Sequence, residues 1–397
     1  MTALLALDGG RPVRTTMLQY GRQSVDEADV EAVVSTLRSA WLTTGPKVGE
    51  FERAFAEHVG TREAVVLSSG TAALHAAMCA LGIGPGDEVI VPALTFVATA
   101  SCVVFQGATP VFADVDEGAL LLDLAQFEAR ITPRTKAVIA VDYAGHPCDY
   151  DALRLITDRH GVALVADACH ALGGAYRGRS VGSLADLSVF SLHAVKNVTT
   201  GEGGVVTTDD ADAARRMRAF RNHGITSDHV ARAERDTWFY EVSDLGYNYR
   251  LTDIQCALGI SQLRKLGGWI ARRQAIAQRY TEAFASLERV EPQTVSADVS
   301  HARHLFVIRL DTSGLSVGRA RIFEALRAEG VGANVHYIPV HLHPYYQERF
   351  RTAEGLCPVA ESAYERILSL PIFADMTDGD ADQVIEAVAK VEAAYLT

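Results

Sequence analysis

Residues 63–113 read EAVVLSSGTAALHAAMCALGIGPGDEVIVPALTFVATASCVVFQGATPVFA, and the order of segments in this stretch decides the fold. Short apolar runs rich in valine and isoleucine, such as EAVVL and DEVIVP, alternate with helical segments such as TAALHAAMCALG. These runs lack regular polar alternation, which is typical of strands that are buried on both faces. Strands interleaved with helices in this way predict an α/β fold with an open, mostly parallel sheet.

The same alternation continues to about residue 210 and then changes. Its later segments are KAVIAVDYAG, YDALRLITDRHG, ALVADACHA, LSVFSLH and GGVVTTD. A long helical stretch at 252–287 leads into a smaller α+β portion, in which HLFVIRL and GANVHYIPV are strand candidates and 377–396 is the final helix. We therefore expect a large domain at 1–262, including the N-terminal segment, and a smaller C-terminal domain at 263–397.

Charge and composition exclude several classes of protein. The formal net charge of -12 argues against a general binder of nucleic acid or anionic membranes. The start of the chain lacks the basic residues and apolar length of a signal peptide, and no apolar stretch reaches membrane-spanning length. The six cysteines form no C-x-x-C pair and no zinc-binding spacing. We expect a cytoplasmic protein with reduced cysteines and no metal site.

Chemically useful residues follow four predicted strands. Ligands of open parallel sheets bind beyond the carboxyl ends of the strands. The segments that follow strands are SSGT at 68–71, Phe96, DACH at 167–170 and SLHAVK at 191–196. Four strand ends would then converge on one cavity.

The SSGT segment opens a predicted helix and offers an anion site. The free N–H groups and the positive end of the helix dipole attract a phosphate, and Gly70 lets the backbone approach it. Thr71 and Ser191 carry hydroxyls that can reach the same anion. Taken alone, Gly-Thr before a helix is also an ordinary capping sequence.

Two further residues suit a flat, charged ring. Asp167 follows the apolar run ALVA, where a carboxylate is costly unless a cation meets it, so it is a candidate partner for a protonated ring nitrogen. It could equally cap the next turn. Phe96 is placed to stack on a flat ligand, although a phenylalanine here could also be plain core.

Lys196 is the one lysine in a distinctive setting. Only five of the 37 basic residues are lysines, and the other four lie in polar loops or on helix faces. Lys196 ends a buried strand and precedes a glycine-rich turn. An amine in a partly desolvated pocket has a lowered pKa and becomes a nucleophile toward a carbonyl.

Together these features match the needs of one cofactor. A phosphate cradle, an aromatic stacking face, a buried carboxylate and a Schiff-base lysine are what pyridoxal 5'-phosphate (PLP) requires. A dinucleotide-binding dehydrogenase is disfavoured because no G-x-G-x-x-G follows the first strand.

The chain resembles the DegT/DnrJ/EryC1/StrS family of PLP-dependent sugar aminotransferases over nearly its whole length. The resemblance is carried by long motifs: SSGTAALHAAMCALGIGPGDEVIVPALTFVATA, DACHALGGAYRGRSVGS, SLHAVKNVTTGEGG, GYNYRLTDIQCALGISQL and SLPIF. It implies the type I fold of PLP-dependent transferases, with a large domain built on a mostly parallel seven-stranded sheet and a smaller C-terminal α+β domain.

The resemblance also implies roles for individual residues. Lys196 would form the Schiff base, Asp167 would pair with the pyridine nitrogen, His170 would lie near the ring hydroxyl and Phe96 would lie over the ring. The phosphate would be bound by Gly70, Thr71 and Ser191, and by Asn248 from the neighbouring subunit of a homodimer. The residues expected to face substrate are Arg250, His336 and Tyr337.

The implied reaction moves an amino group from an amino acid, glutamate by resemblance, to a keto group of a nucleotide-linked deoxysugar. VDYAG at 141–145 and HYIPVHLHPYY at 336–346 are similar to the pseudaminic-acid pathway transaminases, which aminate C4 of a UDP-linked 4-keto-6-deoxy N-acetyl sugar. The opening LALDGGRPVRT instead resembles aminocyclitol-forming relatives in antibiotic pathways, so both substrates stay open. Two further alternatives are a PLP-dependent dehydratase and a non-catalytic regulator. The sugar-dehydrating relatives that carry histidine in place of the lysine are excluded, because this chain keeps Lys196.

Overall fold

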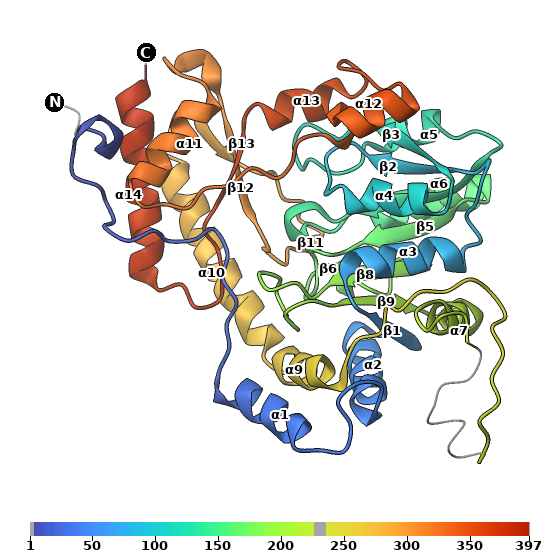
Figure 1. The fold of residues 1–397 in the computed structure, drawn as a ribbon. Helices are drawn as coiled ribbons and strands as arrows, with labels where there is room; N and C mark the ends of the chain where they lie inside the picture. Colours follow the sequence, from blue (N-terminus) through green and yellow to red (C-terminus); the bar gives the residue numbers. More distant parts are fainter. Residues whose placement is uncertain (1–3, 226–235, 397) are drawn as a thin grey trace.

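A computed structural model describes residues 4–225 and 236–396 of the chain (Figure 1). Within these residues a seven-stranded sheet has the order β1-β9-β8-β5-β4-β2-β3. Every neighbouring pair of strands is parallel except the two pairs that β9 forms with β1 and β8. The predicted mostly parallel sheet is therefore confirmed. Its strands are β1 (Glu63–Leu67), β2 (Glu88–Pro92), β3 (Thr109–Ala113), β4 (Thr135–Val141), β5 (Ala163–Asp167), β8 (Leu187–Ser191) and β9 (Gly204–Thr208).

Helices cover this sheet, which explains the continuous apolar runs of its strands. All five residues of β2 and of β9 are buried. Helix α3 packs against β8 and β9, α2 packs against β1, and α6 packs against β5. The helices of this part are α1 (Glu27–Leu37), α2 (Pro46–Val59), α3 (Gly70–Ala80), α4 (Ala98–Phe105), α5 (Leu124–Ala129), α6 (Tyr150–His160), α7 (Ala211–Phe220) and α9 (Asp253–Leu263).

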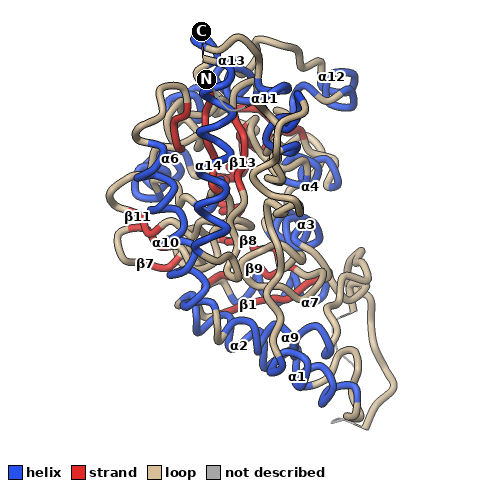
Figure 2. The backbone as a smooth tube through the Cα atoms, turned by 90° about the vertical axis from the view of Figure 1, so that its left-hand side faces the viewer, coloured by secondary structure: helices blue, strands red, loops and turns tan. Residues whose placement is uncertain are grey.

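A second hydrophobic core forms around the antiparallel sheet β10-β12-β13. Helices α10 and α14 pack together beside this sheet, and in Figure 2 they lie far from α12. Aromatic residues such as Tyr280, Phe284 and Phe306 fill the core. Its elements are α10 (Leu266–Phe284), β10 (Val290–Pro292), β12 (Phe306–Leu310), α11 (Arg319–Ala328), β13 (Ile367–Leu370) and α14 (Asp378–Tyr395).

The C-terminal part also returns to the large sheet. Helices α12 (Pro344–Phe350) and α13 (Pro358–Tyr364) lie near β2 and β3 in Figure 1. Tyr346 and Cys357 belong to the hydrophobic core of the large sheet. A small antiparallel sheet joins β11 (Val299–Ser300) to β6 (Ala175–Tyr176) and β7 (Arg179–Ser180). Residues beyond 263 thus contribute to both cores, and the division at 262 and 263 stays a prediction.

Two predicted elements differ from the observed ones. The single helix expected at 252–287 is broken, because α9 ends at Leu263 and α10 begins at Leu266. Lys265 lies at the break, where its N–H bonds Gln262 in a tight turn and its ammonium pairs with Asp26 and Asp29 at 2.7 Å. Gly267 and Gly268 lie in the first turn of α10, where glycine is a weak helix former.

The prediction of a strand at GANVHYIPV, residues 332–340, is wrong. Asn334 forms one isolated bridge with Ser369, after which the backbone leaves the sheet. Pro339 has no N–H to give to a ladder. His336 and Tyr337 follow this bridge and belong to no strand. Among the described residues, no helix combines the length and the apolar character needed to cross a membrane.

Candidate active site

A cavity of about 400 Å³ lies at the carboxyl ends of β1, β2, β4, β5 and β8. It brings together nine of the eleven predicted site residues: Gly70, Thr71, Phe96, Asp167, His170, Ser191, Lys196, His336 and Tyr337. Convergence of the strand ends, which the topology rule anticipated, is therefore observed.

One end of the cavity is the N-terminus of α3. Ser69 caps this helix, and its Oγ accepts a hydrogen bond from the N–H of Ala72 at 3.1 Å. A Cβ atom added to Gly70 would lie 3.0 Å from the Cβ of Ser191 and 3.4 Å from the Sγ of Cys169. Only glycine fits here without displacing a neighbour, so the N–H groups of the first turn remain accessible from the cavity.

Asp167 ends β5 and is only 6% exposed. Its Oδ2 accepts a hydrogen bond from the hydroxyl of Thr99 at 2.7 Å, and its Oδ1 accepts a longer one from the N–H of Cys169 at 3.3 Å. Both donors are neutral, so neither neutralises the carboxylate. A buried carboxylate with free acceptor capacity suits a cationic ring nitrogen.

Lys196 follows β8 and projects its amine into the same cavity. Burial lowers the pKa of the Lys196 amine, while nearby Cys169 and Asp167 oppose this shift. A lowered pKa increases the fraction of neutral amine, which is the nucleophilic form.

His170 and Tyr337 form a hydrogen-bonded pair on one wall. The N–H of Ala144 donates to Nδ1 of His170 at 3.3 Å, so Nε2 carries the ring proton and donates to the Tyr337 hydroxyl at 3.1 Å. Burial holds the pKa of His170 well below its usual value, so this imidazole stays neutral. Phe96 is 53% exposed, and its ring lies 5.8 Å from that of Tyr337.

His336 lies deeper, against β13. Its Nδ1 lies 2.8 Å from the hydroxyl of Ser369, and its backbone carbonyl accepts a hydrogen bond from the hydroxyl of Tyr143. Burial, followed by the charge of Lys196, lowers the pKa of His336 to about 3. This imidazole is therefore neutral at physiological pH.

Asn248 and Arg250 lie outside this cavity. They line a separate hollow of about 590 Å³ together with Asn222 and His223. Arg250 donates a hydrogen bond to Oδ1 of Asn222 at 2.9 Å, and Asn248 is exposed. The roles expected for these two residues, Asn248 from a partner subunit and Arg250 toward substrate, stay predictions.

Several cavity residues were not predicted from the sequence. Tyr20, Thr95, Glu202 and His304 also line the cavity, as do Cys169 and His193 of the predicted segments 167–170 and 191–196. Thr99 lies behind Asp167 and shares a hydrogen bond of 2.7 Å with Thr95. Thr95 lies in the bend between β2 and α4, and Thr99 lies in the first turn of α4, so no regular spacing rule linked the two threonines. Tyr20 and His304 come from distant segments and gave no signal either.

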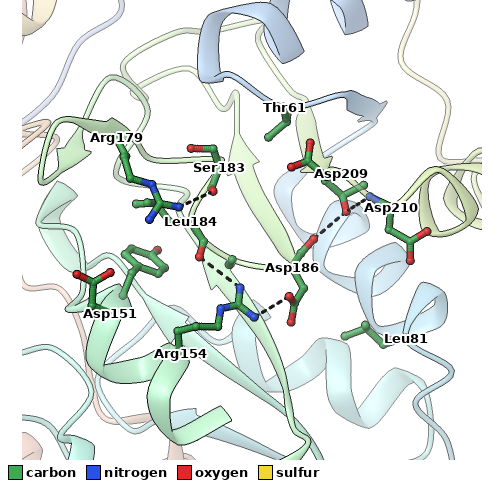
Figure 3. Close-up of a pocket in the computed structure, with 13 residues that line it drawn as sticks. Thr61, Leu81, Asp151, Arg154, Arg179, Ser183, Leu184, Asp186, Asp209 and Asp210 are labelled. Atoms are coloured by element: carbon green, nitrogen blue, oxygen red, sulfur yellow. Dashed lines mark hydrogen bonds and ion pairs between the residues drawn. The ribbon is translucent and has the colours of Figure 1, made fainter. Parts of the chain in front are cut away.

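Another hollow, of about 650 Å³, lies at the opposite edge of the sheet, near the amino ends of β1 and β8 (Figure 3). One ion pair joins two of its charged groups. Arg154 pairs with Asp186 at 2.7 Å, and Arg179 donates to the carbonyl of Ser183 at 3.4 Å. Among the described residues that line it there is no lysine, histidine or cysteine, so no amine, imidazole or thiol is available there for chemistry.

The cavity residues fit PLP. Gly70 leaves room for an anion at the helix N-terminus, Asp167 offers a ring nitrogen a buried carboxylate whose hydrogen bonds come from neutral donors, and Lys196 presents an amine of lowered pKa. A donor set of this kind, in one cavity of about 400 Å³, is suited to a phosphorylated aromatic aldehyde.

Comparison with known sequences gives a family. The profile described as the DegT/DnrJ/EryC1/StrS aminotransferase family matches residues 23–389. The spore coat polysaccharide biosynthesis protein SpsC of Bacillus subtilis (strain 168) is 43% identical over 380 residues, which cover 95% of this chain and 98% of that protein.

Comparison with solved structures agrees. Spr1654 from Streptococcus pneumoniae, described as a sugar aminotransferase, superimposes in its PLP-form with a TM-score of 0.90 and 34% identity, covering 96% of this chain and all 100% of that one. Its PMP-form gives the same TM-score and identity. Helicobacter pylori PseC, an aminotransferase involved in the biosynthesis of pseudoaminic acid, gives a TM-score of 0.89 with 32% identity, covering 96% of this chain and 100% of that one. The type I aminotransferase fold is thereby confirmed.

Proposed function

The chain belongs to the DegT/DnrJ/EryC1/StrS aminotransferase family, and from this premise we propose that it transfers an amino group from glutamate to C4 of a UDP-linked 4-keto-6-deoxy N-acetyl sugar. It is a PLP-dependent sugar aminotransferase. The likeness to PseC supports the choice of sugar class. The observation that best supports the proposed catalysis is that Lys196, Asp167 and the N-terminus of α3 line one cavity.

Each of these groups has a distinct task in the proposal. When bound, PLP supplies an electrophilic carbonyl carbon and a ring that accepts electrons. Lys196 holds this carbonyl carbon covalently between turnovers and, once released, moves a proton as a general base and then as a general acid. Asp167 keeps the ring nitrogen protonated through charge and hydrogen bonding.

The remaining residues hold the cofactor and the substrate. Gly70, Thr71 and Ser191 bind the phosphate at the start of α3. His170 and Tyr337 lie beside the ring hydroxyl, and Phe96 covers one face of the ring. His336 and Tyr337 face the sugar in the cavity of their own chain. Arg250, which lies beside Asn248 outside this cavity, faces the sugar of the partner subunit. These assignments combine cavity geometry with the family pattern.

We further propose a homodimer with shared active sites. Asn248 is exposed, and its hollow is separate from the cavity of its own chain, which leaves it available to a neighbour. In this arrangement Asn248 binds the phosphate held by the partner subunit, and each site needs both chains.

The substrate is tested by mass spectrometry. Purified protein is incubated with glutamate and a panel of nucleotide-linked keto sugars, which includes UDP-linked and dTDP-linked 4-keto-6-deoxy sugars and a keto-cyclitol. We expect the UDP-linked N-acetyl sugar to gain an amine and 2-oxoglutarate to be released in equal amount. Amination of the cyclitol instead would favour the function indicated by the opening LALDGGRPVRT. Release of water from the sugar without 2-oxoglutarate would indicate a dehydratase.

A further inference from the structure

His304 contacts the amine of Lys196, although the two residues are more than a hundred positions apart. The Nε2 atom of His304 lies 3.4 Å from Nζ of Lys196. His304 lies two residues before the start of β12 and is only 5% exposed. Its ring centroid lies 4.5 Å from that of His170. The imidazole of His304 therefore lies in the cavity wall beside the Lys196 amine.

The backbone around His304 is firmly held against the large sheet. The N–H of Ala302 donates to the carbonyl of Gly145 at 2.8 Å, and the N–H of Leu305 donates to the carbonyl of Ala144 at 3.1 Å. Asn197, which directly follows Lys196, donates from Nδ2 to the carbonyl of Ala302 at 3.2 Å. His304 and Lys196 are thus fixed to each other through one buried side chain.

The His304 ring has a single polar partner among the described residues. Its Nδ1 atom is buried and forms no hydrogen bond there. Leaving a buried polar atom unpaired destabilises a protein, and an apolar ring would fill the same space without that cost. Packing alone therefore does not account for a histidine at this position.

The chemistry of the contact follows from the charge of each group. Burial, followed by the charge of Lys196, holds the pKa of His304 well below its usual value, so the ring is neutral. An ammonium group can only donate, so Nε2 of His304 accepts its hydrogen bond while the ring proton lies on Nδ1. The free amine can also donate to the same nitrogen.

We propose that His304 is a positioning residue that accepts a hydrogen bond from the Lys196 amine through Nε2 whenever this amine is free. The contact holds the amine at the cavity wall between proton uptake and proton delivery. It also stabilises the ammonium form more than the neutral amine, and so opposes the effect of burial. The inference rests on the role proposed for Lys196 in the reaction.

The test compares His304→Phe, which keeps a ring of similar size without the acceptor, with His304→Gln, whose amide oxygen can replace Nε2. In protein freed of PLP, Lys196 is acylated with acetic anhydride over a range of pH and its modification is followed by peptide mass mapping. We expect His304→Phe to lower the pH midpoint of this reaction by about one unit and His304→Gln to restore most of it. In the holoenzyme we expect His304→Phe to slow the glutamate half-reaction about tenfold in single turnover, with KM unchanged.

Two results would overturn the proposal. One is a His304→Phe protein with the wild-type pH midpoint and half-reaction rate. The other is a His304→Gln protein as impaired as His304→Phe, which would indicate a structural role. If His304→Phe does not fold, His304→Asn replaces it. The shorter amide of asparagine ends near the position of the histidine Nδ1 and does not reach Lys196, so we expect the same lower pH midpoint and slower half-reaction. Because acylation is measured without PLP, it reports on His304 even if another lysine proves to bind the cofactor.

Discussion

The hydroxyl of Thr99 lies 2.7 Å from Oδ2 of Asp167 and donates a hydrogen bond to it. Thr99 is fully buried near the start of α4, and the hydroxyl of Thr95 lies 2.7 Å from the hydroxyl of Thr99. The carboxylate that we assign to the ring nitrogen is therefore oriented by a chain of two hydroxyls. Its direction in the cavity is fixed before any ligand enters.

Removal of the Thr99 hydroxyl is expected to weaken catalysis without removing the carboxylate. Thr99→Val keeps the size of the side chain but leaves one carboxylate oxygen without its donor. We expect kcat to fall about tenfold, which corresponds to the loss of one hydrogen bond to a charged group. Thr99→Ser is the matched control and should retain most of the activity. Equal steady-state rates for Thr99→Val and wild type would contradict the positioning role.

Gly70 should be irreplaceable for cofactor binding. In Gly70→Ala the new methyl group would lie 3.0 Å from the Cβ of Ser191, so the phosphate site must widen or close. We expect the Kd for PLP to rise at least about tenfold because the backbone can no longer approach the anion. Gly84→Ala is the control, since nothing lies within 4 Å of its added Cβ. Fluorescence titration of both proteins with PLP measures the effect, and an unchanged Kd for Gly70→Ala would argue against a phosphate at this site.

A shared active site predicts complementation between two inactive proteins. Lys196→Ala and Asn248→Ala should each have low activity alone. In a mixed dimer, one of the two sites contains neither substitution. After equal amounts are unfolded and refolded together, we expect about one quarter of wild-type activity, because half of the dimers are mixed and half of their sites are intact. No recovery in a mixture shown to contain mixed dimers would mean that each site is built from one chain.

Stability should decline in mild acid. Burial lowers the pKa of His75 from 6.5 to about 4. Between these values the unfolded chain binds a proton that the folded chain does not, so the free energy of unfolding falls as the pH drops from 6.5 toward 4. His75→Gln should make this decline shallower. Urea unfolding at several pH values measures the free energy of unfolding of both proteins. An identical dependence of this free energy on pH would contradict the lowered pKa of His75.

The site residues that could be predicted from the sequence are those that lie just after a predicted strand. Asp167 and Lys196 each follow an apolar run, and parallel strands bring their carboxyl ends to one edge, so their meeting followed from the parallel orientation of the strands. Gly70 was predictable for the same reason, since it joins a strand to a helix. The mostly parallel sheet followed from the alternation of segments, whereas its seven strands were implied by the family resemblance.

The contributions of distant segments could not be predicted in this way. Tyr20 reaches the cavity from the N-terminal segment, and His304 lies at the amino end of a strand in the second sheet. No periodicity in the sequence links either of them to Lys196. The ion pairs of Lys265 with Asp26 and Asp29 at the helix break also join segments far apart in the chain, so no sign of them is visible in the sequence.

The central claim is that the side-chain nitrogen of Lys196 binds the cofactor covalently. The most direct measurement reduces the purified holoenzyme with borohydride, digests it and locates the added mass by mass spectrometry. We predict that the phosphopyridoxyl group is attached to the peptide that contains Lys196, and that Lys196→Ala folds normally but carries no such group. Attachment to Lys47, Lys136, Lys265 or Lys390 instead, or full aminotransferase activity in Lys196→Ala, would contradict the account.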